Sequence, residues 1–311
     1  MVPGSRVGVL YVMGTSRSGT TLTGEILGQV PGLTYAGEVR WLWDQVATSG
    51  LCGCGRTVSE CDAWRSAVKS DTDPSATAER ARSTARLGDR AVGRRHSWIR
   101  ALGLLVRARA RRPLDPDAVD YGAELASVYA ALARETGCEW VVDTSGEASD
   151  AILIAQLPDV DLRLVHIVRD PRGVVSSHLR AGGRSSGDVA RVTYFAVAWL
   201  MSNLAASLVR RQLSPATTVR VRYEDLVSEP EPTLATVLGL VDRSLPPGLV
   251  ADGHVELAPT HSAAGNPKRF RQGSVELRED TSWHTDLSRV DRALVRLLTL
   301  PMARHYGYGG R

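Results

Sequence analysis

The residues best suited to chemistry follow a short apolar run near the N-terminus. Val7–Met13 is rich in β-branched residues, Gly14-Thr-Ser-Arg-Ser-Gly-Thr-Thr21 comes directly after it, and Leu22–Val30 has apolar residues at helical spacing. This order predicts a strand, a glycine-opened loop and a helix. Backbone N–H groups at a helix start, with Ser and Thr hydroxyls beside them, form a concave set of donors that favours negative charge. The loop therefore predicts an anion site.

One residue in this loop argues against a nucleoside triphosphate as the anion. The spacing Gly14-x4-Gly19 is that of a phosphate-binding P-loop, but Thr20 stands where such a loop needs lysine for the β- and γ-phosphates. An ATP-dependent P-loop kinase is therefore the less favoured alternative. Arg17 lies inside the loop and offers a planar donor fork suited to phosphate or sulfate. The pattern favours a terminal anion that is bound without magnesium.

A second candidate anion site follows a later apolar run. Leu162–Val168 predicts a strand, and the sequence Arg169-Asp-Pro-Arg-Gly-Val-Val-Ser-Ser177 continues from it into a predicted helix. An arginine at a strand end and a serine two helical turns into the next helix can converge on one phosphate. Arg169 and Ser177 are thus predicted to bind a second anionic group.

Together the two motifs resemble those of the bacterial sulfotransferases that use 3′-phosphoadenosine 5′-phosphosulfate (PAPS) and release its desulfo product PAP. The resemblance implies that the first loop holds the 5′-phosphosulfate, and that Arg169 and Ser177 bind the 3′-phosphate. Val221–Pro230 resembles the family's segment near the adenine, which implies a contact from Tyr223. His261–Phe270 resembles the C-terminal loop that closes over the nucleotide. The remaining implied cofactor contacts are Ser16, Arg17, Ser18, Gly19, Thr20, Thr21, Asn266, Lys268 and Arg269.

The resemblance also implies where the acceptor is activated. In related bacterial sulfotransferases a Gly-Glu after the first helix carries the general base, which here is Glu38. Arg40 would share the face of Glu38 if the strand continues, and we expect Arg40 and Arg17 to act on the acceptor or the sulfonate. Trp41 and Trp43 would then line the acceptor pocket. The implied reaction moves a sulfuryl group from PAPS to a hydroxyl or amine of a small molecule such as a secondary metabolite.

One departure from the family pattern keeps an alternative open. Many relatives have lysine at the end of Val-Asp-Ser-Ser-Lys, where it reaches the cofactor, but this chain reads Val142-Asp-Thr-Ser-Gly146. Loss of one preorganised cation typically costs about 10²–10³ in rate unless another group replaces it. Either Arg17, Arg40 or Lys268 substitutes, or the protein is a sulfotransferase-like homologue that binds a nucleotide or partner and catalyses a different displacement or cyclisation, or none.

Cysteine and histidine offer further chemistry. Three thiols in the pattern Cys52-x-Cys54-x6-Cys61 could bind zinc with a fourth ligand from elsewhere, form a disulfide, or stay free. None of them is expected to act in catalysis, and sulfuryl transfer is expected to require no metal. His261 is the second choice for the acceptor base. His166 lies inside the strongest apolar run and is predicted to be a core residue.

The surrounding sequence predicts the elements that position these residues. Continuous apolar runs alternate with helical patterns, which is typical of a three-layer α/β domain with a central parallel sheet, here of about four to five strands. We expect one sulfotransferase-like domain over residues 1–311 with a helical lid insertion at about 62–116, rich in arginine, and a long irregular segment at Pro246–Asp280. The further strands are predicted at Leu33–Val39, Trp140–Asp143 and Thr218–Arg222, and the further helices at about 117–135, 147–156, 172–181, 188–212, 231–241 and 286–305.

Composition sets the outer limits. The chain has 311 residues, 38 basic against 34 acidic side chains and a formal net charge of +4, so a nucleic-acid or membrane partner is not expected. No apolar run near the start is long enough for an anchor, and a cytoplasmic location is expected. A small-molecule acceptor is the expected partner. Acceptor identity, oligomeric state and a protein partner stay open.

Overall fold

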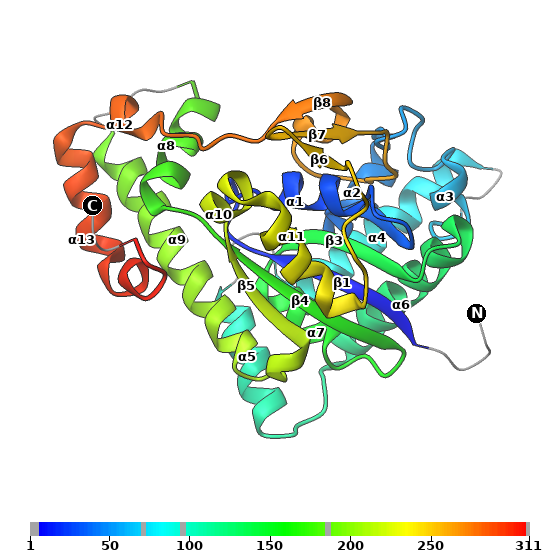
Figure 1. Cartoon of the computed structure of the whole chain (residues 1–311). Helices are drawn as coiled ribbons and strands as arrows, with labels where there is room; N and C mark the ends of the chain where they lie inside the picture. The colour runs from blue at the N-terminus through cyan, green and yellow to red at the C-terminus, as the bar shows by residue number, and fades with distance from the viewer. Residues whose placement is uncertain (1–5, 70–72, 94–97, 184–187, 309–311) are drawn as a thin grey trace.

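A parallel sheet forms the centre of the molecule. In this computed structural model, which describes residues 6–69, 73–93, 98–183 and 188–308, the sheet has five strands in the order β2-β3-β1-β4-β5 (Figure 1). All neighbouring pairs run parallel. β1 therefore lies in the middle with a neighbour on each side. The strands are β1 (Val7–Met13), β2 (Leu33–Gly37), β3 (Trp140–Gly146), β4 (Val160–Val168) and β5 (Thr218–Arg222).

Helices cover both faces of this sheet. Alternate β1 side chains point to opposite faces, so that Val9 and Tyr11 join one hydrophobic cluster while Leu10 and Val12 join another. The first cluster lies under α6 (Pro116–Thr136), α7 (Ala148–Ile154) and α9 (Val189–Arg210), and the second lies under α1 (Thr20–Leu27), α10 (Tyr223–Ser228) and α11 (Pro230–Leu238). This is the predicted three-layer α/β architecture. The C-terminal α13 (Arg289–His305) packs on α9 and on α8 (Pro171–Ala181).

Each of the five predicted strands is present, but one ends early. β2 stops at Gly37, which has φ of 79°, and the chain then forms the short 3₁₀ helix η1 (Val39–Trp41) and α2 (Leu42–Ala47). The prediction that this strand continues to Val39 was wrong. Glycine tolerates the left-handed region that ends the strand, and most other residues do not.

The predicted irregular segment at Pro246–Asp280 contains a second sheet. Its antiparallel strands are β6 (Val250–Ala251), β7 (His254–Leu257) and β8 (Gly273–Glu276), and they lie over α1 at the top of Figure 1. Strands of two to four residues are too short to produce a recognisable alternation of polar and apolar residues. The same segment also holds η4 (Pro267–Phe270), and α12 (Trp283–Asp286) follows it.

The insertion is helical, as predicted, but none of its described residues lines the cleft at the strand ends, so its expected place as a lid is not supported. It contains α3 (Asp62–Arg65), α4 (Pro74–Val92) and α5 (Trp98–Arg109), and the first four residues of the arginine-rich run that begins at 94 lie outside the described residues. α4 packs on α2 and α6, and α5 packs on α7 and α9. The insertion therefore covers the helical layer of the core.

One helix in the described part of the chain, α9, is long and apolar enough to cross a membrane by length and composition alone. In the structure it packs against α13, α8 and α5. Core helices of soluble proteins pass the same test, so this feature is weak evidence for a membrane span. The expected cytoplasmic location stays a prediction.

A buried polar network connects the core to the loop after β1. His166 on β4 is fully buried, and its Nε2 lies 3.1 Å from Asn203 Oδ1 on α9. The Asn203 amide in turn donates to Thr15 Oγ1 at 3.0 Å and to the Trp199 carbonyl at 2.8 Å. His166 is thus the core residue that its position predicted. Burial lowers the pKa of His166 to about 3, which keeps the ring neutral.

This depressed pKa predicts a specific acid sensitivity. Between pH 6.5, the ordinary histidine value, and about pH 3, the unfolded chain binds a proton at His166 that the folded chain does not. Acidification over this window should therefore lower the unfolding free energy of wild type, relative to His166→Gln, by about 1.4 kcal/mol per pH unit. Denaturant unfolding of both proteins at several pH values measures the difference. A difference that stays constant with pH would contradict the assignment.

Candidate active site

Most of the predicted site residues meet where the five strands end. Parallel strands place their carboxyl ends at one edge of a sheet, and ligands of open α/β sheets bind in the crevice there. A cleft of about 890 Å³ opens at this edge, which is within the range of ligand-binding pockets. Each strand delivers a lining residue just at or beyond its end, namely Gly14 after β1, Glu38 after β2, Gly146 in β3, Arg169 after β4 and Tyr223 after β5.

The loop after β1 is built around two residues with left-handed backbone. Arg17 has φ of 73° and Gly19 has φ of 98°. A Cβ atom on Gly19 would lie 2.6 Å from the ring of Tyr223, so only glycine fits at this position. The turn leads straight into α1, whose first N–H groups have no partner within the helix and face an incoming anion.

The loop residues do not all face the cleft. Ser16, Arg17, Gly19, Thr20 and Thr21 line it. Thr15 and Ser18 do not. The Ser18 side chain is fully buried, its Oγ has no hydrogen-bond partner among the described residues, and its N–H donates to the Thr15 carbonyl. The expected contact of Ser18 with the cofactor is therefore not supported by its position.

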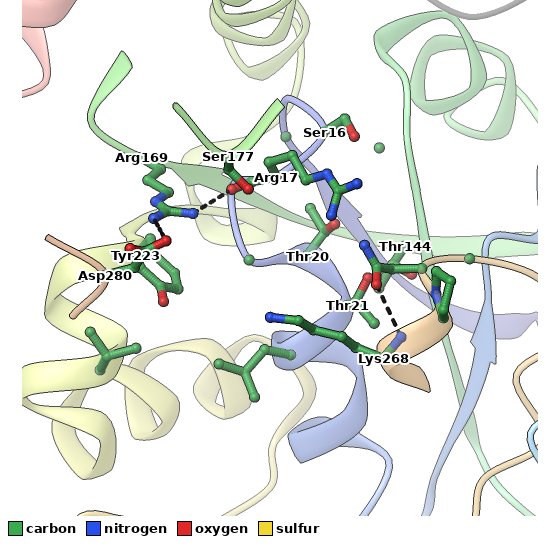
Figure 2. Close-up of a pocket in the computed structure, with 18 of the residues that line it drawn as sticks. Ser16, Arg17, Thr20, Thr21, Thr144, Arg169, Ser177, Tyr223, Lys268 and Asp280 are labelled. Atoms are coloured by element: carbon green, nitrogen blue, oxygen red, sulfur yellow. Dashed lines mark hydrogen bonds and ion pairs between the residues drawn. The ribbon is translucent and has the colours of Figure 1, made fainter. Parts of the chain in front are cut away.

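The second predicted anion site is also in the cleft. Arg169 lies beside the first loop, where its guanidinium donates to the Arg17 carbonyl at 2.9 Å and to Asp280 at 3.0 Å, and it stacks over the Tyr223 ring at 4.5 Å (Figure 2). Ser177 on α8 lines the same cleft. The structure thus brings three predicted residues together. Arg169 follows β4, Ser177 lies in α8, and Tyr223 begins α10 after β5.

Two lining residues near Arg169 were missed in the sequence. Arg180 lies one helical turn after Ser177 on α8, so helical spacing alone could have placed it on the same face. Asp280 accepts hydrogen bonds from both Arg169 and Arg180, and no local pattern marks it because it lies about a hundred residues away along the chain. Burial raises the pKa of Asp280, but hydrogen bonds from Ser282 and Arg169 outweigh it and hold the pKa well below its usual range. Asp280 is therefore ionised, and its carboxylate occupies guanidinium donors of Arg169 and Arg180 that an anionic ligand would need.

The C-terminal loop contributes to the cleft with two of its three predicted residues. Asn266 and Lys268 line it, and Lys268 extends from η4 into the open space of the cleft (Figure 2). Burial, together with the nearby Arg271 and Arg17, lowers the pKa of Lys268 below its ordinary 10.5. Arg269 instead is buried and donates to the carbonyls of Ser262 and Leu51. Arg269 therefore has a structural role, and the expected contact with the nucleotide is not supported.

The Gly-Glu segment is divided between the cleft and the core. Glu38 and Trp41 line the cleft, whereas Trp43 is buried in the core, so its expected place in the acceptor pocket was wrong. Arg40 also points away from the cleft, and its guanidinium pairs with Asp150 at 2.5 Å with both side chains 4% exposed. Because the strand ends at Gly37, Arg40 sits in a 3₁₀ turn and does not share the face of Glu38. The expected catalytic role of Arg40 is therefore corrected.

His261 was the second choice for the acceptor base. His261 does not line the cleft. Its ring nitrogen lies 3.4 Å from Cys61 Sγ, so His261 is not placed to act as a base in the cleft.

Gly146 does line the cleft and has φ of 81°, and a Cβ there would lie 3.0 Å from the Gly14 carbonyl. Of the three proposed substitutes for the lysine, Arg17 and Lys268 line the cleft and Arg40 does not.

The sheet order, the glycine turn and the cations at the strand ends define the class of α/β proteins that bind phosphorylated or sulfated ligands at a helix start. A sulfotransferase family model matches residues 10–247, and the chain belongs to this family.

Two solved structures share the fold over nearly the whole chain. The "Sulfotransferase Domain from the Curacin Biosynthetic Pathway" is 16% identical with a TM-score of 0.54, over 98% of this chain and 99% of that chain. The "Sulfotransferase Domain from the Synechococcus PCC 7002 Olefin Synthase" is 18% identical with a TM-score of 0.54, over 99% and 97%. No match is found among curated proteins. The predicted family and fold are confirmed.

The Arg40–Asp150 pair yields a prediction about stability. Removal of one partner leaves a buried charge uncompensated, so Arg40→Ala should lower the unfolding free energy by about 3–5 kcal/mol. The double variant Arg40→Met/Asp150→Leu, which removes both charges, should be more stable than Arg40→Ala. Arg17→Ala is the control, because Arg17 lines the open cleft. Denaturant unfolding measures all three, and an Arg40→Ala protein of wild-type stability would contradict the structural role.

Proposed function

We propose that the cleft binds PAPS and transfers its sulfuryl group to a hydroxyl or amine of a small-molecule acceptor, such as a secondary metabolite. The observation that carries this proposal is that two separate groups of side chains and N–H donors suited to anions line one cleft. One is the loop Gly14–Thr21 at the start of α1, and the other is formed by Arg169 and Ser177. PAPS carries two separate anionic groups, the 5′-phosphosulfate and the 3′-phosphate, so two such sites suit it better than a single phosphate chain.

The residues present fit this ligand. The Arg169 side chain is 7% exposed, and its Nη2 already donates to the Asp280 carboxylate, as it would to a phosphate. Ser16, Thr20 and Thr21 supply hydroxyls beside the N–H groups of the loop. Tyr223 presents an aromatic ring beside them. We therefore assign the loop to the 5′-phosphosulfate, Arg169 and Ser177 to the 3′-phosphate, and Tyr223 to the adenine side.

The chemistry divides between the ligand and the protein. PAPS, when bound, supplies an SO₃ unit on a phosphate leaving group. Glu38 is proposed as the general base that takes the proton from the acceptor hydroxyl or amine, since it lines the cleft directly after the end of β2. Its backbone N–H donates to the Ala264 carbonyl at 2.9 Å, which fixes it against the C-terminal loop. Trp41 provides an apolar wall for the acceptor.

Two cations are available for the charge that develops during transfer. Arg17 comes from the anion loop and Lys268 from the C-terminal loop, and both line the cleft. Preorganised cations at such a position stabilise a transition state more than a ground state. We propose that Lys268 and Arg17 together take the place of the lysine that Gly146 lacks. No metal has a part in this mechanism.

A homologue that has lost sulfuryl transfer is the second candidate, and Gly146 is the observation that favours it. Such a protein would bind PAP and PAPS through the same residues but would release no PAP. Incubation of wild type with PAPS and a panel of hydroxyl and amine acceptors separates the two candidates. PAP release with at least one acceptor supports transfer, and tight PAPS binding without any release supports the second candidate.

The 3′-phosphate assignment predicts the effect of Arg169→Ala on PAP binding. Loss of a charge-assisted donor pair in a buried site should cost about 1.5–3 kcal/mol of binding free energy, which raises the dissociation constant by about 10–150-fold. Calorimetric titration of the folded variant with PAP measures it. An unchanged dissociation constant would refute the assignment.

A change at Asp280 provides a matched control, because it should not weaken PAP binding as Arg169→Ala does. The phosphate has to compete with the Asp280 carboxylate for the Arg169 Nη2 donor, so Asp280→Asn should bind PAP at least as tightly as wild type. A loss of affinity as large as that of Arg169→Ala would mean that the two variants merely disturb the same structure.

Glu38→Gln tests the base. The carboxylate acts on the acceptor proton during transfer, so this variant should lower kcat by about 10²–10⁴-fold and leave the PAP dissociation constant unchanged. Rates of PAP release and calorimetric PAP binding give the two readouts. Near-normal turnover in Glu38→Gln would assign the base to another residue.

A further inference from the structure

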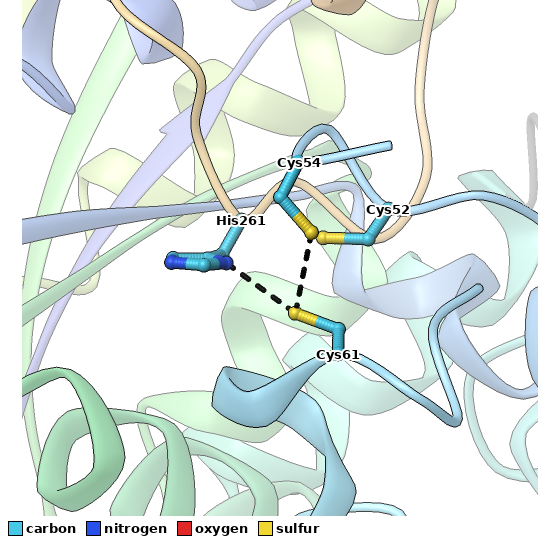
Figure 3. Close-up of side chains that lie close together, drawn as sticks. All are labelled: Cys52, Cys54, Cys61 and His261. Carbon is cyan, nitrogen blue, oxygen red and sulfur yellow. Dashed lines mark hydrogen bonds between the residues drawn. The ribbon is translucent and has the colours of Figure 1, made fainter. Parts of the chain in front are cut away.

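A cluster of metal-ligating side chains lies outside the cleft. Cys52, Cys54 and Cys61 come from one loop, and His261 comes from a segment two hundred residues further along the chain (Figure 3). Their ligand atoms all lie within 4.8 Å of one another. Figure 3 shows the three thiols and the imidazole pointing toward a common centre.

Two distances inside the cluster match those of a tetrahedral site. With Zn–S of about 2.3 Å and Zn–N of about 2.0–2.1 Å, tetrahedral geometry places two sulfur ligands about 3.8 Å apart and sulfur and nitrogen about 3.6 Å apart. In the structure Cys54 Sγ lies 3.6 Å from Cys61 Sγ, and Cys61 Sγ lies 3.4 Å from His261 Nδ1. The ligands are therefore already positioned before any ion is considered.

The backbone around the cluster holds this arrangement from both sides. The Gly53 N–H donates to the Ser262 carbonyl at 2.9 Å, and Trp64 Nε1 donates to the His261 carbonyl at 2.6 Å. A Cβ on Gly53 would lie 2.6 Å from the Thr260 carbonyl, so this residue has to be glycine for the two segments to approach. Cys52 and Cys61 are buried. Backbone hydrogen bonds thus position His261, the fourth ligand, and leave its ring free of these contacts.

We propose that Cys52, Cys54, Cys61 and His261 bind one zinc ion. Three thiolates and one imidazole are the donor set that zinc prefers, and four protein ligands leave no open position for a substrate. The site is therefore structural. It is separate from the proposed metal-free transfer chemistry and does not depend on it.

The position of the site indicates what the zinc would do. His261 precedes Gly265, Asn266 and Lys268, which line the cleft, and the cysteine loop follows Trp41, which also lines it. Zinc would therefore join the two segments that form this wall of the cleft. Its removal should loosen the C-terminal loop and lower the melting temperature, because metal binding to a structural site contributes directly to folding.

The other two states of the cysteines make different predictions. A disulfide would join two of the three thiols and exclude the metal, although the four cysteines are free in the structure. Packed free thiols would bind no metal and would react with a thiol reagent once accessible. Of these three states, only zinc binding uses all three cysteines and His261 together.

The test is the metal content of the full-length protein after gel filtration, measured by mass spectrometry of the elements. We expect about one zinc per chain in wild type, and at least about a fivefold loss in Cys61→Ser and His261→Ala. His261→Cys restores a four-ligand set and should retain zinc. Cys138→Ser is the matched control, because Cys138 lies outside the cluster, and it should also retain zinc.

Wild type alone keeps the proposal testable if the variants fail to fold. Its cobalt-substituted form should show the intense visible absorption of a tetrahedral thiolate site, and a chelator should lower its melting temperature by more than about 5 °C. Wild type without stoichiometric metal, or with the mass of a disulfide-bonded chain, would overturn the proposal. Neither readout depends on PAP binding or turnover, so failure of the zinc site and failure of the proposed function are distinguishable.

Discussion

The turn between β1 and α1 is the constraint on which the rest of the site depends. β1 is the middle strand, so the chain has to reverse within a few residues to place α1 on one face while its first N–H groups stay at the sheet edge. Arg17 and Gly19 make this reversal in left-handed conformation, and Tyr223 packs where a Gly19 side chain would be. The same turn presents the Arg17 carbonyl to Arg169. The two anion sites are therefore one connected structure.

Acidic residues balance the cations of this structure in different ways. Asp280 pairs with Arg169 and Arg180 at the cleft surface, where a phosphate can compete for the same donors. Asp150 pairs with Arg40 in the interior, where exchange with a ligand is blocked by burial. Two arginines that follow strand ends thus differ in their surroundings: Arg169 is proposed to bind a ligand, whereas Arg40 is paired in the interior. Exposure of the acidic partner separates them.

Much of this could be predicted from the sequence, and the failures have local physical causes. Continuous apolar runs marked the strands of the parallel sheet, and the glycine spacing marked the loop before α1. The alternation that placed Arg40 beside Glu38 assumed a strand that Gly37 ends. The cysteine spacing left zinc, a disulfide and free thiols open, and it could not supply a fourth ligand, because His261 meets Cys61 only through the fold. Asp280 was unpredictable for the same reason, since its partners come from distant segments.

We propose that one cleft recognises a nucleotide through two separated anionic groups and without a metal. Calorimetric titration of the full chain with PAP in buffer without added magnesium, against ATP with magnesium, tests it most directly. We expect PAP to bind and ATP to bind much more weakly, since Thr20 replaces the lysine that a triphosphate requires. Tight binding of ATP with magnesium, with no heat from PAP, would contradict it.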